Sequence, residues 1–252
     1  MIFSFIEYFN SLPGLNAFQY ITVRSVMALF TTLLIYLVFG KMSIRWIAAQ
    51  QFGQTVRTDG PQTHLKKSGT PTMGGVLLWV GVIVSVLVWG RLDNFYLILT
   101  ATVSWAFFLI GFFDDYRKII LKDSDGLRAR FKFPLQVGFA FLWLYVLFNI
   151  AGFDTHLSVP FFKTFAPDLG VWYIPFGVCV IVGASNAVNL TDGLDGLVSG
   201  PSIISFLAYG VFAYTVGHLT IANYLQIPFS PEIAAPTGLL GVGELSVFCG
   251  AV

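Results

Sequence analysis

The stretch Phe95-Tyr-Leu-Ile-Leu-Thr-Ala-Thr-Val-Ser-Trp-Ala-Phe-Phe-Leu-Ile-Gly-Phe-Phe113 runs for 19 residues without a charged side chain and ends directly at Asp114-Asp115. A helix needs about 20 mostly apolar residues to cross the roughly 30 Å of hydrocarbon in a bilayer. The whole chain shares this character, since 56% of its 252 residues are apolar, 11% are charged and the mean hydropathy is +0.77. Soluble domains contain about 25% charged residues. The composition therefore predicts an integral membrane protein.

Apolar runs of this kind predict an all-α fold, a polytopic transmembrane helical bundle that forms a single membrane domain over residues 1–252. Six runs are long enough to predict full spans, and they are Ile21–Phe39, Met73–Trp89, Phe95–Phe113, Leu135–Ile150, Trp172–Val188 and Leu197–Val216. A seventh run, Leu239–Val252, is interrupted by Glu244 and is too short to span. We therefore expect an incomplete seventh span, in which the polypeptide stops inside a membrane helix as the N-terminal portion of a longer protein.

The positions of the basic residues predict the orientation of the chain in the membrane. With the N-terminus outside, connections at about 41–71, 114–134 and 189–196 face the cytoplasm, and the first two hold 11 of the 14 Lys and Arg residues. Cytoplasmic loops carry an excess of Lys and Arg, so this topology is favoured. The formal net charge of +1 gives no argument for a nucleic-acid partner.

The first cytoplasmic connection ends in a segment suited to binding an anion. Lys67 precedes Gly69-Thr70-Pro71-Thr72-Met73-Gly74-Gly75, which leads into the second span. Glycine lets backbone amides approach a phosphate closely, and a helix N-terminus adds partial positive charge. The alternative is that Gly-Thr-Pro forms an ordinary turn and Gly74-Gly75 a close helix contact.

The second connection begins with two adjacent carboxylates, Asp114 and Asp115, followed by Lys118 and Lys122. Vicinal residues on a helix point about 100° apart, so one carboxylate can hold a cation while the other addresses a substrate. Oxygen ligands without nearby His or Cys suit Mg²⁺, which binds one or two carboxylates together with water and substrate phosphates. The alternative is a set of acidic and basic residues at a solvated interface.

The third connection contains polar residues spaced three apart, namely Asn186, Asn189, Asp192 and Asp195. In a helix this spacing keeps the four side chains near one face. The connection has no basic residue of its own, so its carboxylates need an external cation or the bases of neighbouring loops. The alternative is an ordinary helix-terminating turn.

Together, the acidic residues at two inner helix ends and the surrounding Lys and Arg predict a site for Mg²⁺ and phosphates at the cytoplasmic face. Such a site can bring a soluble nucleotide-diphosphate donor to a phosphate anchored in lipid. The main barrier is repulsion between anions, which Mg²⁺ and Lys lower by neutralising charge and aligning the reactants. A phosphate monoester has a second pKa near 6, so a strong general base is not required.

The order and spacing of these motifs resemble the bacterial phospho-N-acetylmuramoyl-pentapeptide transferases (translocase I), within the polyprenyl-phosphate sugar-1-phosphate transferase superfamily. The motifs are Phe52-Gly53-Gln54 with Arg57, Asp59-Gly60-Pro61, His64, Lys67, Gly69 to Gly75, Asp114 to Lys118, and Asn186 to Gly196. The resemblance implies Mg²⁺-dependent transfer of phospho-MurNAc-pentapeptide from UDP-MurNAc-pentapeptide to undecaprenyl phosphate in the bacterial inner membrane. The products would be UMP and lipid I, a precursor of peptidoglycan, and a homodimer is compatible with the resemblance.

The resemblance also implies roles for individual residues. Asp114 and Asp115 would be the catalytic aspartates and the candidate Mg²⁺ ligands, with Asp115 or its neighbour assisting the attacking lipid phosphate. The nucleotide and phosphate cleft would be lined by Lys67, Thr72, Lys118, Lys122, Asn189, Asp192 and Asp195. Direct attack by the lipid phosphate and a covalent phospho-aspartate step both remain open.

The family implied by the resemblance is longer than this chain. Its members have ten spans, and their later part supplies a further functional aspartate and a histidine-rich cytoplasmic loop. We therefore expect at most residual activity from this chain alone. An inactive fragment that retains partial nucleotide or lipid-phosphate binding is the main alternative. A transporter is less favoured, because its carboxylates would be expected near the membrane midplane.

Overall fold

The structure, a computed structural model, describes residues 15–49, 73–120, 126–157, 159, 162, 165–192, 196–229, 233–234 and 239–252. Its α-helices are α2 (Ile21–Ala49), α4 (Gly75–Trp89), α5 (Phe95–Ile120), α6 (Ala129–Ala151), α7 (Tyr173–Thr191), α8 (Ser199–Val216), α9 (Leu219–Leu225) and α10 (Leu245–Ala251). Short 3₁₀ turns η1 (Leu15–Gln19), η2 (Gly170–Trp172) and η3 (Val242–Glu244) accompany them. Strands β1 (Ile233–Ala234) and β2 (Leu239–Leu240) form an antiparallel hairpin. The prediction of an all-α bundle is confirmed apart from this hairpin.

Five helices in the described ranges are long and apolar enough to cross a membrane, namely α2, α5, α6, α7 and α8. The prediction of six full spans is thus too high by one for the described residues. The run predicted over Met73–Trp89 is helical only from Gly75 in α4, whose 15 residues extend about 22 Å, which is short of the hydrocarbon thickness.

Two helices extend further toward the predicted cytoplasmic connections than hydropathy indicated. α5 continues to Ile120, so that Asp114 and Asp115 lie on its last turns and not in a loop. α6 begins at Ala129, although the apolar run was predicted to begin at Leu135. Pro134 lies inside this helix, where proline removes one backbone hydrogen bond and is normally avoided. The charged end of α5 and the charged, proline-containing start of α6 are hydrophilic. They are still helical, because each continues a membrane span beyond its apolar region.

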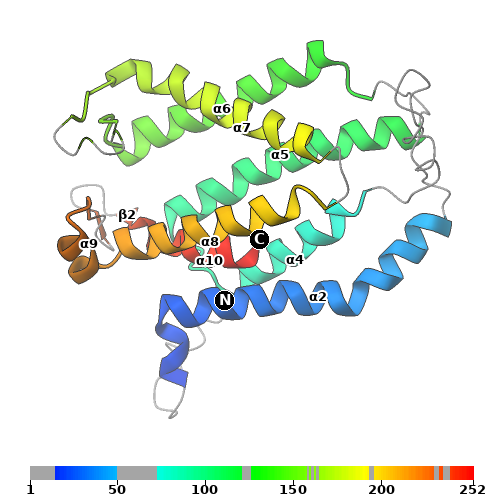
Figure 1. Cartoon of the computed structure of the whole chain (residues 1–252), viewed down its shortest axis with the longest axis horizontal. Helices are drawn as coiled ribbons and strands as arrows, with labels where there is room; N and C mark the ends of the chain where they lie inside the picture. The colour runs from blue at the N-terminus through cyan, green and yellow to red at the C-terminus, as the bar shows by residue number, and fades with distance from the viewer. Residues whose placement is uncertain are drawn as a thin grey trace.

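The helices form two groups on either side of α5. α6 packs against both α5 and α7, whereas α2, α4, α8 and α10 pack together on the other side (Figure 1). The buried core of the second group includes Ala28, Val82, Leu97, Val247 and Phe248. The described apolar side chains outside this core are largely exposed, as in a bundle whose outer surface faces lipid.

The run predicted as an incomplete seventh span forms part of the core. α10 packs against both α2 and α8, and its Val247 and Ala251 have no exposed surface. Small residues permit this close approach, since a Cβ added at Gly250 would lie 2.4 Å from the carbonyl oxygen of Ser25. Small residues at helix contacts are typical of membrane bundles. The run is therefore packed between longer helices, while its incomplete span stays a prediction.

A buried ion pair joins the two ends of the chain's sequence near the start of α2. Arg24 on α2 and Glu244 in η3 are 2% and 5% exposed, and the guanidinium donates two hydrogen bonds to the carboxylate. Arg24 Nη1 also donates to the carbonyl of Trp89 at 3.1 Å, and the backbone N–H of Arg91 donates to Glu244 Oε2 at 3.2 Å. The pair thus ties α2, the α4–α5 connection and η3 together.

Candidate active site

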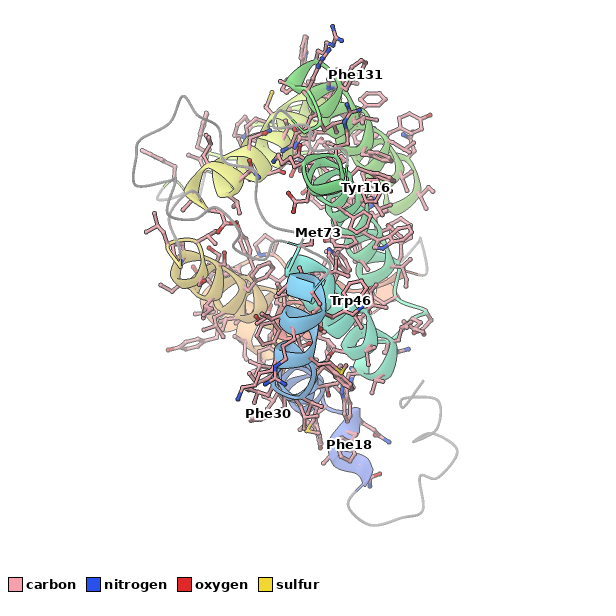
Figure 2. The ribbon with its side chains drawn as sticks, turned by 90° about the vertical axis from the view of Figure 1, so that its right-hand side faces the viewer. Phe18, Phe30, Trp46, Met73, Tyr116 and Phe131 are labelled. Atoms are coloured by element: carbon pink, nitrogen blue, oxygen red, sulfur yellow. The ribbon has the colours of Figure 1, made fainter. Side chains whose placement is uncertain are left out.

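The ends of five helices bring the predicted site residues to one end of the bundle. Figure 2 looks onto this end, where Trp46 of α2, Met73 before α4, Tyr116 of α5 and Phe131 of α6 mark the helix ends. The last turn of α7 reaches the same end (Figure 1). We call it the Asp115 end. The described segments predicted to face the cytoplasm therefore lie together, as the alternation of spans requires.

The two adjacent aspartates on α5 have different surroundings. The side chain of Asp114 is 10% exposed, whereas that of Asp115 is 45% exposed. Their different exposure follows from the helix, because successive side chains point about 100° apart. One carboxylate is therefore enclosed by protein and the other is accessible.

Protein groups occupy both carboxylate oxygens of Asp114. Lys118 Nζ donates to Asp114 Oδ2 at 2.8 Å, and Lys132 Nζ of α6 lies 3.5 Å from the same oxygen. The backbone N–H of Leu127 donates to Oδ1 at 2.7 Å. Gly126 has φ +62°, and a Cβ there would lie 2.6 Å from Asp114 Oδ1. The residues before α6 thus fold closely over this carboxylate.

Asp115 is the accessible carboxylate of the pair. Its Oδ1 lies 4.0 Å from Lys118 Nζ, which is longer than a hydrogen bond. Lys132 and Asp192 also act on Asp115 electrostatically, so three helices, α5, α6 and α7, place charges around it. This arrangement can bind an anion through the lysines and a cation through the carboxylates.

The end of α7 supplies the remaining described polar groups. Asn189 and Asp192 are exposed, with Asp192 directly following the helix. Asn186, one turn earlier, is half-buried and donates its amide N–H to Gln136 Oε1 at 2.9 Å. The helical spacing predicted for these residues is present, but Asn186 faces α6.

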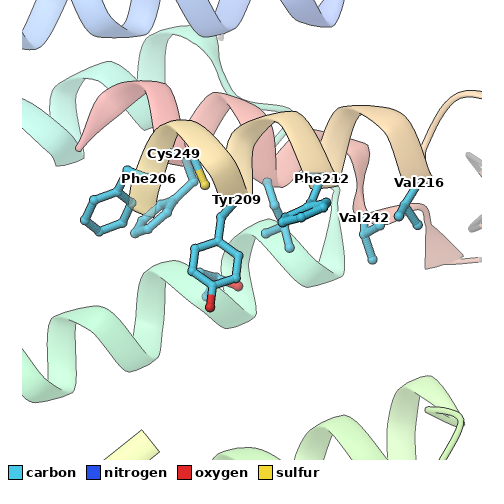
Figure 3. Close-up of a pocket in the computed structure, with 10 residues that line it drawn as sticks. Phe206, Tyr209, Phe212, Val216, Val242 and Cys249 are labelled. Carbon is cyan, nitrogen blue, oxygen red and sulfur yellow. The ribbon is translucent and has the colours of Figure 1, made fainter. Parts of the chain in front are cut away.

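A separate apolar pocket lies between α5, α8 and α10 (Figure 3). Its lining includes Phe206, Phe212, Val242 and Cys249 and no charged side chain. Thr100, which also lines it, precedes Asp115 by about 22 Å along α5. The pocket is therefore separate from the charged site.

Comparisons with known proteins match both the motifs and most of the sequence. The model of glycosyl transferase family 4 matches residues 96–234, and signature 1 of the phospho-N-acetylmuramoyl-pentapeptide-transferases matches residues 67–77. A phospho-N-acetylmuramoyl-pentapeptide-transferase of Maridesulfovibrio salexigens is 46% identical over 100% of this chain and 68% of its own length. The protein of that name from Desulfotalea psychrophila is 48% identical over 96% of this chain and 65% of its own length.

The chain belongs to the phospho-N-acetylmuramoyl-pentapeptide-transferase family. It is accordingly a multi-pass membrane protein, in agreement with its five long apolar helices. The chain spans about 65% of the length of the first curated relatives it matches. Within it, the family 4 match covers both Asp115 on α5 and Asp192 after α7.

Several residues predicted to line a transferase site lie outside the described residues. They are Lys67, Thr72, Lys122 and Asp195. Lys67 and Thr72 fall within the transferase signature, but the anion cradle itself stays a prediction. The described members, Asp114, Asp115, Lys118, Asn189 and Asp192, all lie at the Asp115 end.

The structure adds residues that motif reasoning missed. Lys132 was counted only as one of many inner basic residues, yet it reaches Asp114 from a neighbouring helix. Gly126 and Gln136 belong to no motif, and their roles depend on contacts across the fold. Lys132 could have been sought from the sequence, because a carboxylate enclosed at the end of a membrane helix needs a basic partner.

The accessible carboxylates suit the Mg²⁺ that the transferase family generally uses. No group of three or more His, Cys, Asp or Glu side chains occurs among the described residues. Mg²⁺ needs only one or two carboxylates when substrate phosphates and water complete its shell. Asp115 and Asp192 provide oxygen donors of this kind, whereas the oxygens of Asp114 already accept protein hydrogen bonds.

Proposed function

We propose that the chain transfers phospho-MurNAc-pentapeptide from UDP-MurNAc-pentapeptide to undecaprenyl phosphate, releasing UMP and forming lipid I for peptidoglycan synthesis. The main support is the placement of a half-exposed Asp115 beside Lys118, within the electrostatic reach of Lys132 and Asp192. Family membership supports the substrates, because the matched relatives carry the name of this transfer.

In the proposed reaction, an oxygen of the lipid phosphate attacks the sugar-linked phosphorus of the donor. The bond from that phosphorus to the bridging oxygen breaks, and the electron pair leaves with UMP. The attacking phosphate is mostly deprotonated at neutral pH, so Asp115 needs only to accept the remaining proton. We favour this direct attack over a phospho-aspartate, because it uses Asp115 without requiring a second displacement.

The lysines have distinct parts in this proposal. Lys132 lies 3.5 Å from the enclosed Asp114, and Lys118 lies close to both aspartates. Lys118, 38% exposed, then provides positive charge for incoming phosphates. Bound Mg²⁺, held by Asp115 and Asp192, would supply further neutralisation of phosphate charge and alignment of the phosphate oxygens. Asn189 is exposed nearby and is proposed to contact the nucleotide.

The site is proposed to face the cytoplasm, with the N-terminus outside. The Asp115 end carries Lys118, Arg128, Arg130 and Lys132, whereas the described residues at the opposite end carry Arg91 and buried Arg24. This asymmetry supports the orientation through the positive-inside rule. It also places the site where a soluble nucleotide donor is available.

A second candidate function is binding of nucleotide or lipid phosphate without turnover. The observation that favours it is that the chain spans about 65% of the length of the relatives it matches. The two candidates differ in one product, because only the transferase releases UMP.

The test uses the purified chain in lipid nanodiscs, UDP-MurNAc-pentapeptide, undecaprenyl phosphate and Mg²⁺. We expect Mg²⁺-dependent UMP release that Asp115→Asn reduces by about 100-fold or more, because the variant loses a proposed Mg²⁺ ligand together with a proton acceptor. Asp93→Asn is the matched control, because Asp93 is an exposed aspartate at the opposite end of α5 and should leave the rate unchanged. Mg²⁺-dependent binding of UMP without any release would establish the second candidate.

A further inference from the structure

A buried polar contact joins α6 and α7 two turns from the Asp115 end. Gln136 is 3% exposed and accepts a hydrogen bond from Asn186 Nδ2 at 2.9 Å. Its own amide donates to Ser185 Oγ at 3.5 Å, and Asn186 Nδ2 also donates to the carbonyl of Val182. A buried amide must be paired, because an unpaired polar group in an apolar region is costly.

The same face of α6 reaches the aspartate helix. Lys132 precedes Gln136 by one helical turn, so the two side chains lie on one face of α6. Lys132 Nζ lies 3.5 Å from Asp114 Oδ2 on α5. Further along this face, Leu144 packs closely against α7, where a Cβ at Gly177 would lie 2.8 Å from a Leu144 methyl. One face of α6 thus contacts α5 at its start and α7 along its length.

The position of α7 relative to α5 is set mainly through α6. α6 packs extensively with both helices, whereas α5 and α7 make no comparable direct contact in the described residues. Asn186 lies three residues before Asn189 and six before Asp192. The hydrogen bond to Gln136 therefore fixes the rotation of α7 just before its site residues.

We propose that Gln136 is a positioning residue that sets where Asn189 and Asp192 stand relative to Asp115. The catalytic and binding roles of those three residues rest on the proposed function. The placement of α7 by Gln136 does not depend on that function. The close contact of Leu144 with Gly177 holds the two helices together further from the site. A paired amide with a defined donor and acceptor specifies one register.

The experiment measures the distance between α5 and α7 directly. Cys179 and Cys249 are first replaced by Ser and Ala, and spin labels are placed at exposed Ile98 on α5 and Leu190 on α7. The labels then lie toward opposite ends of the bundle, because Ile98 is near the start of α5 and Leu190 is in the last turn of α7. Pulsed electron paramagnetic resonance of the chain in nanodiscs reports the distance distribution.

Gln136→Met removes the amide while keeping an apolar side chain of similar length. We expect the distance distribution to shift and broaden, and Asn186→Leu to cause the same change. The double variant should match either single variant, because both remove one shared contact. Asn149→Leu is the matched control, since the amide of Asn149 donates to Tyr145 within α6 and should leave the distribution unchanged.

The kinetic measurement separates positioning from general stability. We expect Gln136→Met to raise the KM for UDP-MurNAc-pentapeptide by about tenfold, the usual effect of losing a residue that orients the groups in contact with a ligand. The KM for undecaprenyl phosphate should change little. An unchanged distance distribution, or the same change in Asn149→Leu, would overturn the inference even if Gln136→Met unfolded at a lower temperature. A shifted distribution in a chain that neither binds nor turns over the nucleotide would retain the positioning role and reject the proposed function.

Discussion

Asp114 and Asp115 are chemically identical neighbours, yet the fold gives them different surroundings. Asp114 accepts hydrogen bonds from Lys118 and from the backbone of Leu127, so it is enclosed and neutralised. Asp115 lies 4.0 Å from Lys118 and its side chain is accessible among the described residues. The sequence motif predicts the pair of aspartates. Which of the two is enclosed depends on which one the start of α6 covers.

Gly126 tests how closely the chain must fold over Asp114. Gly126→Ala forces a left-handed backbone on a non-glycine residue and places a methyl group against the carboxylate. We expect a loss of about 1–3 kcal/mol in the free energy of unfolding, the usual cost of such backbone strain, measured by chemical denaturation in detergent. Gly138→Ala is the control, because nothing lies near its Cβ position and alanine favours the helix. Equal stability of the two variants would contradict the close approach.

His156 gives a pH-dependent signal outside the membrane-spanning segments. Its Nδ1 lies 2.6 Å from Asp154 Oδ1, and this hydrogen bond, with the carboxylate charge, raises the pKa of His156 above its ordinary 6.5. The contact therefore stabilises the folded loop at pH values below about 6.5, and the contribution disappears as pH rises through the raised pKa. NMR titration should show the raised value, with a return to about 6.5 in Asp154→Asn. A wild-type value at or below 6.5 would exclude the contact.

At the residue scale, sequence reasoning found the acids because their motif is local. It missed Lys132 as their partner, because that contact crosses from α6 to α5. It treated Glu244 only as an interruption of the last apolar run and gave Arg24 no role, although the rule that buried charges are paired could have linked them. Contacts between distant segments cannot be assigned from spacing when several basic residues are available.

At the element scale, hydropathy located the spans but not their ends. α5 and α6 continue as helices through charged residues, because a helix that leaves the membrane can present polar side chains to water. The run that forms α10 is predicted as an incomplete span because of its length. The structure adds that Gly250 and Ala251 let it pack between α2 and α8.

The contact between α2 and η3 depends on the Arg24–Glu244 pair. Because both side chains are buried, Arg24→Met or Glu244→Met alone leaves the other charge buried without its counter-ion, and we expect each to cost about 3–5 kcal/mol. The double variant Arg24→Met/Glu244→Met removes both charges and should recover most of this loss. Thermal unfolding in detergent, analysed as a double-mutant cycle, provides the measurement. Additive losses in the double variant would show that the two side chains act independently.

At the scale of the whole molecule, the fold gathers the functional segments at one end. The charge pattern predicts that this end faces the cytoplasm. In a cysteine-free background, Arg130→Cys at the Asp115 end and Asp154→Cys at the other end present exposed single thiols. We expect a membrane-impermeant maleimide to label position 154 in intact cells and position 130 only after permeabilisation. The reverse labelling pattern would invert the topology and separate the site from cytoplasmic nucleotide.

The central claim is that Asp115, in this lysine-flanked setting, carries the transfer of phospho-MurNAc-pentapeptide to lipid phosphate. Its most direct test is UMP release by the wild-type chain and by Asp115→Asn, each measured with Mg²⁺ and with EDTA. Even a slow wild-type rate suffices, because the comparison is relative. We predict release that requires Mg²⁺ and falls by about 100-fold or more in Asp115→Asn. Release at the wild-type rate in Asp115→Asn, or equal release in EDTA, would contradict the account.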